Sequence, residues 1–276
     1  MKYFSIISVV VILIVGFLIW QGVYFPKEPG SLGKTRFLVE RGQDAEEIAD
    51  NLKGVGLIRY SFGFRWYASI SGKANKLKAG EYELSPSMTI SEIIDKMVSG
   101  DMIKRTITII EGWTLEDIAE YLKVEELDPS LEGYLFPDTY ELSYDDGINE
   151  IIEKILVNFD KKTKGKFGKR PDLEIIIMAS LLEKEVRSLE DKKMVAGVLK
   201  NRLETGMLLQ VDAAMITYEI KGLPSRPICN PGLESIEAAI YPTENNYLYY
   251  LSTPEGETIF SKTFKEHNIA VNKYLR

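Results

Sequence analysis

The stretch IIIMASLLEKEV, residues 175–186, decides how the second half of the chain folds. Seven of the eight residues from 175 to 182 are apolar, and three charged residues follow with no turn signal between. Pro171 and Asp172, just before the apolar run, are typical of a helix start. The pattern predicts a buried helix that carries the carboxylates of Glu183 and Glu185 at its end.

The first of these carboxylates lies on the apolar side of the predicted helix. Glu183 falls on the same stripe as Ala179 and Ser180, which are four and three positions before it. Desolvation disfavours an ionised carboxylate, and a general acid that works at neutral pH needs this property. The alternative is a helix that emerges from the core with both glutamates in solvent, and the pattern alone does not exclude it.

Composition limits the chemistry that is available. The chain has 276 residues and a net charge of −7, which argues against a general nucleic-acid binder. It has one cysteine, Cys229, and one histidine, His267, which argues against a Cys/His metal site. Ser-His or Cys-His catalysis would need His267 as the base. We therefore expect no metal and no cofactor, and we look to carboxylates for catalysis.

The N-terminus favours a membrane location. No charged side chain occurs from Tyr3 to Pro26, and a helix needs about 20 apolar residues to span a bilayer. A cleaved signal peptide is the alternative, but it would have a shorter apolar run and a small-residue cleavage site. Here Trp20 and Tyr24 follow instead, as in an interfacial aromatic belt. We expect a single transmembrane anchor within residues 1–26, with the rest of the chain on the extracytoplasmic side of the cell membrane.

A local pattern occurs twice after a short linker at residues 27–35. Residues 35–53 and 106–123 each combine a strand, a glycine turn and an amphipathic helix, and they align when Gly42 is placed on Gly112. Such a repeat predicts small α+β units, although chance similarity of two amphipathic helices is the alternative. The pattern resembles the opening of LysM modules, which bind the glycan backbone of cell-wall polymers.

The second half of the chain reads as helices joined by loops. Apolar periodicity predicts one helix over residues 151–159, and residues 161–171 read as a basic loop that contains glycine. Ser188 can cap a further helix that ends at Gly206. Together with the strands of the first half, this predicts an α+β protein.

Several specific strings follow one another along the chain. They are LEGYLFPDTYEL (131–142), ASLLEKEV (179–186), NRL (201–203), LLQVD (208–212), KGLP (221–224), NPG (230–232), AAIYP (238–242), YLYY (247–250) and TFKEHN (263–268). In this order the strings resemble the endolytic murein transglycosylase family, the YceG-like proteins. The resemblance covers nearly the whole chain, because the family is also built from an anchor helix, a LysM-like region and a catalytic domain. We expect these regions at residues 1–26, 36–125 and 126–276.

The resemblance implies that Glu183, the first glutamate of the E-K-E run, is the catalytic residue. It also implies non-hydrolytic cleavage of the MurNAc–GlcNAc bond within nascent peptidoglycan strands, which leaves a 1,6-anhydro end and terminates elongation. Glu183 would protonate the leaving oxygen and then take the proton of the sugar's C6 hydroxyl as that oxygen attacks C1. Intramolecular attack gains from proximity and needs no activated water. Peptidoglycan is the expected partner, together with the glycan-synthesising machinery.

Other residues of these strings are candidates for sugar binding, and each has a structural alternative. Side chains that can hydrogen-bond hydroxyls and acetamides are Glu132, Gln210, Asp212 and Asn230. Aromatic side chains that can stack on pyranose faces are Tyr134, Phe136 and Tyr140.

Two rival functions remain open at this stage. A muramidase would hydrolyse the same bond and would need a second carboxylate, for which Glu185 and Asp212 are candidates. A non-catalytic wall-binding anchor would need only the LysM-like repeats. The chain also departs from the family pattern at residues 212–226, where Ala213 replaces a proline and Ser225 and Arg226 replace a proline and a glycine. This departure leaves the substrate preference open.

Overall fold

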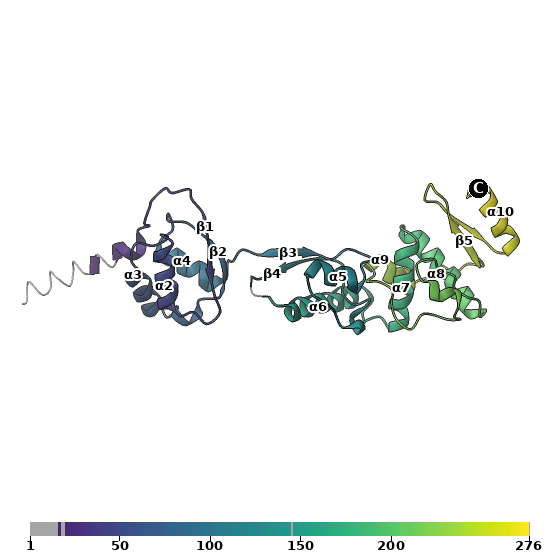
Figure 1. The fold of residues 1–276 in the computed structure, drawn as a ribbon, viewed down its shortest axis with the longest axis horizontal. Helices are drawn as coiled ribbons and strands as arrows, with labels where there is room; N and C mark the ends of the chain where they lie inside the picture. Colours follow the sequence, from purple (N-terminus) through teal and green to yellow (C-terminus); the bar gives the residue numbers. More distant parts are fainter. Residues whose placement is uncertain (1–15, 18–19, 145, 276) are drawn as a thin grey trace, which may run out of the picture. The chain divides into compact units, whose positions relative to one another are not determined.

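The computed structural model describes residues 16–17, 20–144 and 146–275 of the chain (Figure 1). The chain forms two compact units. Unit 1 runs to Thr106 and also contains residues 141–147, and unit 2 contains residues 107–140 and those from 148 to the C-terminus. The expected α+β composition is confirmed in the described residues, with helices and short antiparallel sheets.

Unit 1 is a two-stranded sheet covered by helices (Figure 1). Strand β1 (Thr35–Val39) pairs antiparallel with β2 (Gly80–Leu84), so that Phe37 lies opposite Tyr82. Both of these aromatic side chains are buried in the core of the unit. The helices that complete this core are α2 (Ala45–Gly54), α3 (Ser61–Ile70) and α4 (Ile90–Ser99), with a short 3-10 helix, η1 (Ala74–Lys76).

Side chains at the helix starts fix two of these elements. Asp44 and Thr89 cap α2 and α4, and each forms a capping box with the glutamate three residues later. Such a box satisfies backbone N–H groups that have no partner within the helix. Gly100 ends α4 with a φ of 79°, in the left-handed conformation that glycine adopts without steric cost.

The chain leaves unit 1 along β3 (Arg105–Thr108), and β3 pairs with β4 (Thr139–Leu142). Unit 2 is mainly helical. Its helices are α5 (Leu115–Leu122), α6 (Ile148–Phe167), α7 (Leu173–Glu185), α8 (Leu189–Glu204), α9 (Leu233–Ile240) and α10 (Phe264–Tyr274), with 3-10 turns η2 (Pro129–Leu131) and η3 (Met215–Tyr218). A hairpin of β5 (Tyr249–Ser252) and β6 (Thr258–Ser261) precedes α10.

Helix α7 is the centre of unit 2. It packs against α8 and α9, and every residue from Ile176 to Leu182 is buried (Figure 1). The prediction of a buried helix at this place is confirmed, with Asp172 at its N-cap and Glu185 as its last residue. Burial of each large aliphatic side chain contributes about 1.5–3 kcal/mol, so α7 is held in one position relative to its neighbours.

The strand, glycine turn and helix that the sequence repeats are present in both places. Gly42 lies between β1 and α2 with a φ of 88°, and Gly112 lies between β3 and α5 with a φ of 80°. Thr114 caps α5 with a capping box to Asp117, as Asp44 caps α2. The two segments fall in different units, and their resemblance to LysM modules stays a prediction.

The prediction of an N-terminal transmembrane helix needs correction. Within the described ranges, the structure contains no helix with both the length and the apolar character needed to cross a membrane. Most of the predicted span, residues 1–15 and 18–19, lies outside the described residues. At its C-terminal end, Val23 is fully buried and the ring of Tyr24 packs edge-on against Tyr67 of α3, 5.9 Å between centroids. Val23 is therefore part of the core of unit 1, whereas Tyr24 contacts Tyr67 and stays exposed.

The predicted basic loop at residues 161–171 is also wrong for most of its length. Helix α6 continues to Phe167, because Thr163 is fully buried and its hydroxyl donates to the carbonyl of Phe159. Lys164 adds an ion pair with Asp160 one turn earlier, at 2.9 Å. Only residues 168–172 connect α6 to α7.

Candidate functional site

Glu183 lies in the last turn of α7 and has three hydrogen-bond donors. Its Oε2 accepts from the backbone N–H of Gly232 at 2.8 Å and from the Ser235 hydroxyl at 2.7 Å. Its Oε1 lies 3.2 Å from Nζ of Lys192. The side chains of Glu183 and Lys192 are only 8% and 4% exposed. The carboxylate at the end of this apolar helix is therefore nearly buried, yet it is hydrogen-bonded and has a counter-ion.

Two neighbouring helices supply these donors. Lys192 lies near the start of α8, where Ser188 caps the helix, and its aliphatic stem shares the buried face with Val195. Gly232 is the N-cap of α9 and has no side chain to satisfy the first N–H groups of that helix. Glu183 takes this role from α7, where the partial positive charge of the α9 N-terminus also favours an anion.

The turn before α5 brings a second carboxylate to this place. The Gly112 N–H donates to the Asn230 carbonyl at 2.9 Å, and the Asn230 N–H donates to the Trp113 carbonyl at 2.8 Å. Gly112 also approaches Glu183 closely, because a Cβ on Gly112 would lie 3.6 Å from the Glu183 Cγ. Glu111 precedes Gly112, and a Cβ on Gly232 would overlap the Glu111 carboxyl group.

Glu111 is exposed as a residue, yet its carboxyl group lies against the α9 N-terminus and is partly desolvated. This burial raises the pKa of Glu111, and the charge of Glu183 raises it further. The Lys192 ammonium acts in the opposite direction, and Glu234 adds a further increase. Glu111 and Glu183 thus form two neighbouring carboxyl groups, one near solvent and one nearly buried.

Asn230 holds three segments of the site together. It is fully buried, and its Oδ1 accepts from the backbone N–H of Leu135 at 2.8 Å. Its Nδ2 donates to the Trp113 carbonyl at 3.0 Å and to Glu132 Oε1 at 3.1 Å. Of the predicted site residues, Asn230 and Glu132 therefore contact each other, and the chain beyond Asn230 reaches Glu183 through Gly232.

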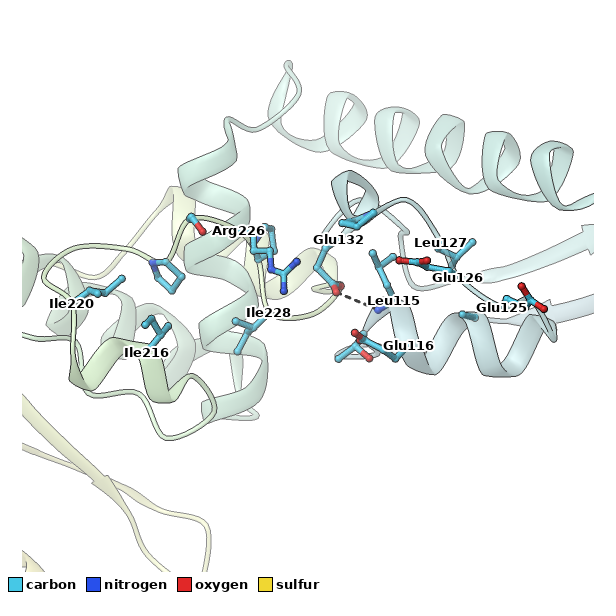
Figure 2. A pocket seen from close by; sticks show the side chains of 16 residues that line it. Leu115, Glu116, Glu125, Glu126, Leu127, Glu132, Ile216, Ile220, Arg226 and Ile228 are labelled. Carbon is cyan, nitrogen blue, oxygen red and sulfur yellow. Dashed lines mark hydrogen bonds between the residues drawn. The ribbon is translucent and has the colours of Figure 1, made fainter.

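Glu132 faces a cavity of about 710 Å³ within unit 2 (Figure 2). Its Oε2 accepts from the backbone N–H of Leu115 at 3.2 Å, and burial raises the pKa of its carboxyl group. Figure 2 shows Arg226 extending from the other side of the cavity toward Glu132. Glu183 is not among the lining residues, which include Glu116, Leu127, Ile216, Ile220 and Ile228.

Glu185 is held by different segments from those that hold Glu183. It accepts from the Tyr250 hydroxyl at 3.0 Å and from the backbone N–H of Ala213 at 3.4 Å. Burial raises the pKa of Glu185, although the Tyr250 hydrogen bond opposes this. Asp212 lies close enough to raise the same pKa, and it is exposed and accepts from the Tyr218 hydroxyl. Asp212 therefore lies beside Glu185.

The aromatic candidates belong mainly to the core. Phe136 and Tyr140 are 5% and 7% exposed, and the Tyr140 hydroxyl donates to the Phe136 carbonyl. Tyr134 packs edge-on against Phe159, with the Arg170 guanidinium 4.8 Å from its ring centroid. Phe136 and Tyr140 are thus core residues, whereas Tyr134 is only partly buried. Gln210 is exposed in a loop with a φ of 49°, and the sequence suggested no such strain.

Sequence reasoning missed Glu111, Lys192 and Ser235. The repeat pattern places Glu111 and Gly112 in a LysM-like segment, and nothing in the local sequence predicts that Glu111 lies beside Glu183. Lys192 lies three residues before Val195 on the apolar face of its helix, and a lysine in such a place needs a buried partner. Ser235 carried no signal beyond its place three residues after a glycine N-cap.

The fold and the site define a class of protein: an α+β protein whose acidic site is built on one apolar helix and on the turns that cross its end. The chain belongs to the YceG-like family, because the sequence model of that family matches residues 37–216 and 217–273.

Proteins of known name in this family are similar over most of the chain. The chain is 30% identical to an endolytic murein transglycosylase of Bacillus subtilis, over 95% of this chain and 91% of that protein. It is 26% identical to an endolytic murein transglycosylase of Streptococcus pneumoniae, over 86% of this chain and 58% of that longer protein. A solved YceG-like protein of Listeria monocytogenes superposes with a TM-score of 0.52 at 28% identity, over 87% of this chain and all of that one.

Proposed function

We propose that this chain is an endolytic murein transglycosylase, a lyase that cuts the glycan strands of peptidoglycan. Its family and the names of its relatives support this function. The observation that carries the proposal is the nearly buried carboxylate of Glu183, which is held by Lys192 and by the α9 N-terminus. A solvated surface glutamate, as a non-catalytic wall anchor would have, does not need three donors.

The reaction that fits this site breaks the bond between MurNAc C1 and the oxygen of the next GlcNAc. The C6 hydroxyl oxygen of the same MurNAc attacks C1, which forms the 1,6-anhydro ring. One proton goes to the leaving oxygen and one leaves the C6 hydroxyl, so the protein regains the proton that it gives. Glu183 is the group that we assign to this proton transfer. Water is not consumed, because the nucleophile belongs to the substrate.

The glycan strand would reach this carboxylate on the side where Glu111 is exposed. The cavity bordered by Glu132 and Arg226 is also lined by Thr114 and Leu115, which directly follow the 111–113 turn. Glu132 and Arg226 would hydrogen-bond sugar hydroxyls or acetamide groups there. Peptidoglycan lies outside the cytoplasm, so both units would act on the extracytoplasmic side.

Endolytic cleavage within nascent strands would end their elongation. In this role the enzyme would work beside the glycan-synthesising machinery. Residues 212–226, which depart from the family pattern, border the cavity at Ile216 and Arg226. They are the segment on which the substrate preference of this chain would depend.

Hydrolysis of the same bond is the second candidate, because Glu111 gives the site a second carboxyl group beside Glu183. A muramidase with two such groups would activate water. Mass spectrometry of peptidoglycan digested by the purified protein separates the two reactions, since anhydro and reducing ends differ by one water. We expect anhydro-MurNAc ends from internal cleavage. Reducing ends would favour the hydrolase, and an unchanged polymer would contradict both.

A further inference from the structure

The Glu111 carboxyl group lies beside Glu183 at the α9 N-terminus. Among the described residues, neither an ion pair nor a hydrogen bond is formed by its side-chain oxygens, whereas Glu183 accepts three. The two groups differ in another respect. Glu183 is nearly buried behind the α9 N-terminus, and Glu111 is exposed on the turn in front of it.

The turn is fixed so that Glu111 cannot move away without breaking backbone contacts. Gly112 and Trp113 exchange hydrogen bonds with Asn230 in both directions, at 2.9 and 2.8 Å. Gly112 has a φ of 80° and lies within contact distance of the Glu183 stem. Because Gly232 has no side chain, the Glu111 carboxyl group can lie against its backbone.

The charges that face Glu111 come from every helix packed around it. From α7 these are Glu183 and also Lys184, whose Nζ would lie 3.8 Å from a Cβ on Gly112. Helix α8 contributes Lys192, and α9 contributes the exposed Glu234. Lys192 is bound to Glu183, so its charge stabilises the anion of Glu183 directly and that of Glu111 only from a distance. Both carboxyl groups reach Gly232, and the negative charge of Glu183 disfavours ionisation of Glu111.

We propose that Glu111 and Glu183 hold one proton between them, with Glu111 as the partner that carries it when the substrate is absent. This inference rests on the proposed transglycosylase function and adds a second residue to it. Glu111 acts through Glu183 as a positioning residue for the proton.

With this arrangement, the proton that the enzyme donates and the proton that it accepts are both handled by Glu111 and Glu183. The pair gives its proton to the leaving GlcNAc oxygen as the bond from that oxygen to C1 breaks. The ionised Glu183 accepts the proton of the C6 hydroxyl as the new bond from O6 to C1 forms. Transfer of that proton to the ionised Glu111 restores the starting state, and no water or other reactant is used.

The first test is the pH dependence of anhydro-end formation by the full chain. For Glu111→Gln we expect kcat to fall by about 10²-fold or more at neutral pH, with KM within about twofold of its original value. The pH profile of the remaining activity should differ from that of the original protein, because Glu111 no longer carries the proton. The matched control is Glu190→Gln, an exposed carboxylate at the start of α8 that is not among the charges acting on Glu111, and its profile should be unchanged. A Glu111→Gln protein with the original kcat and pH optimum would overturn the proposal, because the amide preserves the shape of the turn.

The second test does not depend on activity. In the full chain with ¹³C-labelled glutamate carboxyl groups, NMR should show that the pKa of Glu111 is raised above the ordinary value of a glutamate. In Glu183→Gln the midpoint of Glu111 should move to lower pH, because the neighbouring negative charge is gone. An unchanged Glu111 midpoint in this variant would contradict the proposal that the two groups share a proton. If the Glu111 midpoint depends on Glu183 but the protein forms no anhydro ends, the proposed function is wrong and the proposal of a shared proton is still supported.

Discussion

Nζ of Lys192 lies 3.2 Å from Oε1 of Glu183, and both side chains are almost removed from solvent. Taking either charge out of water is unfavourable, and each ion makes the burial of the other tolerable. Removing one partner leaves a charge without compensation at the end of α7. This relationship gives the site its structure and makes it sensitive to single substitutions.

Lys192→Met should destabilise unit 2 strongly. The substitution keeps the aliphatic volume and leaves Glu183 without its counter-ion, which typically costs about 3–5 kcal/mol in the free energy of unfolding. Urea denaturation followed by circular dichroism measures this loss. Lys193→Met is the matched control, because Lys193 is partly exposed and its partner Glu237 keeps an ion pair with Lys166. The control should change stability by less than about 1 kcal/mol. Equal effects in the two variants would contradict the buried-pair interpretation.

Glu183→Gln should abolish cleavage, and it should also lower stability, because the buried Lys192 ammonium loses its counter-ion. The amide is nearly isosteric with the carboxyl group, and it can accept from Gly232 and Ser235, but it cannot transfer a proton. General acid–base groups contribute about 10²–10⁴-fold to rate, so a trace of activity can remain. Glu185→Gln is the control within the same helix end, since Tyr250 and Ala213 hold Glu185 away from the Glu183 contacts. Anhydro ends are quantified by mass spectrometry. A similar loss in both variants would mean that the two glutamates work as a pair.

Asn230→Ala should weaken the site and the fold together. The substitution leaves the buried N–H of Leu135 without an acceptor and removes both donations from Nδ2. Each buried polar group left unpaired costs about 1–3 kcal/mol. Urea denaturation should show this loss, with reduced cleavage because the 111–113 turn is no longer held. Asn246→Ala, at an exposed position, should stay within about 0.5 kcal/mol. A stable and active Asn230→Ala protein would show that the turn is fixed by its backbone contacts alone.

Gly232→Ala should displace the Glu111 carboxyl group and leave the fold intact. The backbone of Gly232 has an ordinary φ of −74°, so alanine is not strained there, but its Cβ would overlap the Glu111 side chain. We expect a marked fall in kcat with an unchanged melting temperature. In Gly165→Ala the new Cβ meets nothing within 4 Å in the last turn of α6, and this control should gain no more than about 0.5–1 kcal/mol in stability. Full activity of Gly232→Ala would argue against a role for the Glu111 position.

The stability of the protein should depend on pH through Glu185. Burial raises its pKa in the folded state above the ordinary value of 4.5, so the folded protein binds this proton more tightly than the unfolded chain. Stability therefore falls as pH rises from about 4.5 through the raised pKa. Glu185→Gln removes this dependence, and its melting temperature relative to the original protein should increase between pH 4 and pH 7. A constant difference in melting temperature across this range would show that burial does not raise the pKa of Glu185 in the folded protein.

Much of the local structure follows from nearby residues. The apolar run at residues 175–182 and the start signal at Asp172 predict α7, because a helix of such composition is stable only inside a core. The periodicity that predicts a helix over residues 151–159 does not show that α6 continues to Phe167. A buried threonine and an ion pair one turn apart extend it, and these depend on what packs against the helix.

The sequence by itself determined the α+β composition, the apolar helix with a carboxylate at its end, and the family, since these depend on residue order along one segment or on ordered strings. Only the tertiary structure decided which groups meet at Glu183. Lys192 is nine residues away in sequence, Gly232 is 49 away, and Glu111 comes from a turn that precedes α5. The same is true of the predicted sugar-stacking rings, which the packing of α6 places in the core. Hydrogen bonds and charge pairs between distant segments form only when the core fixes where those segments cross, and no local pattern contains that information.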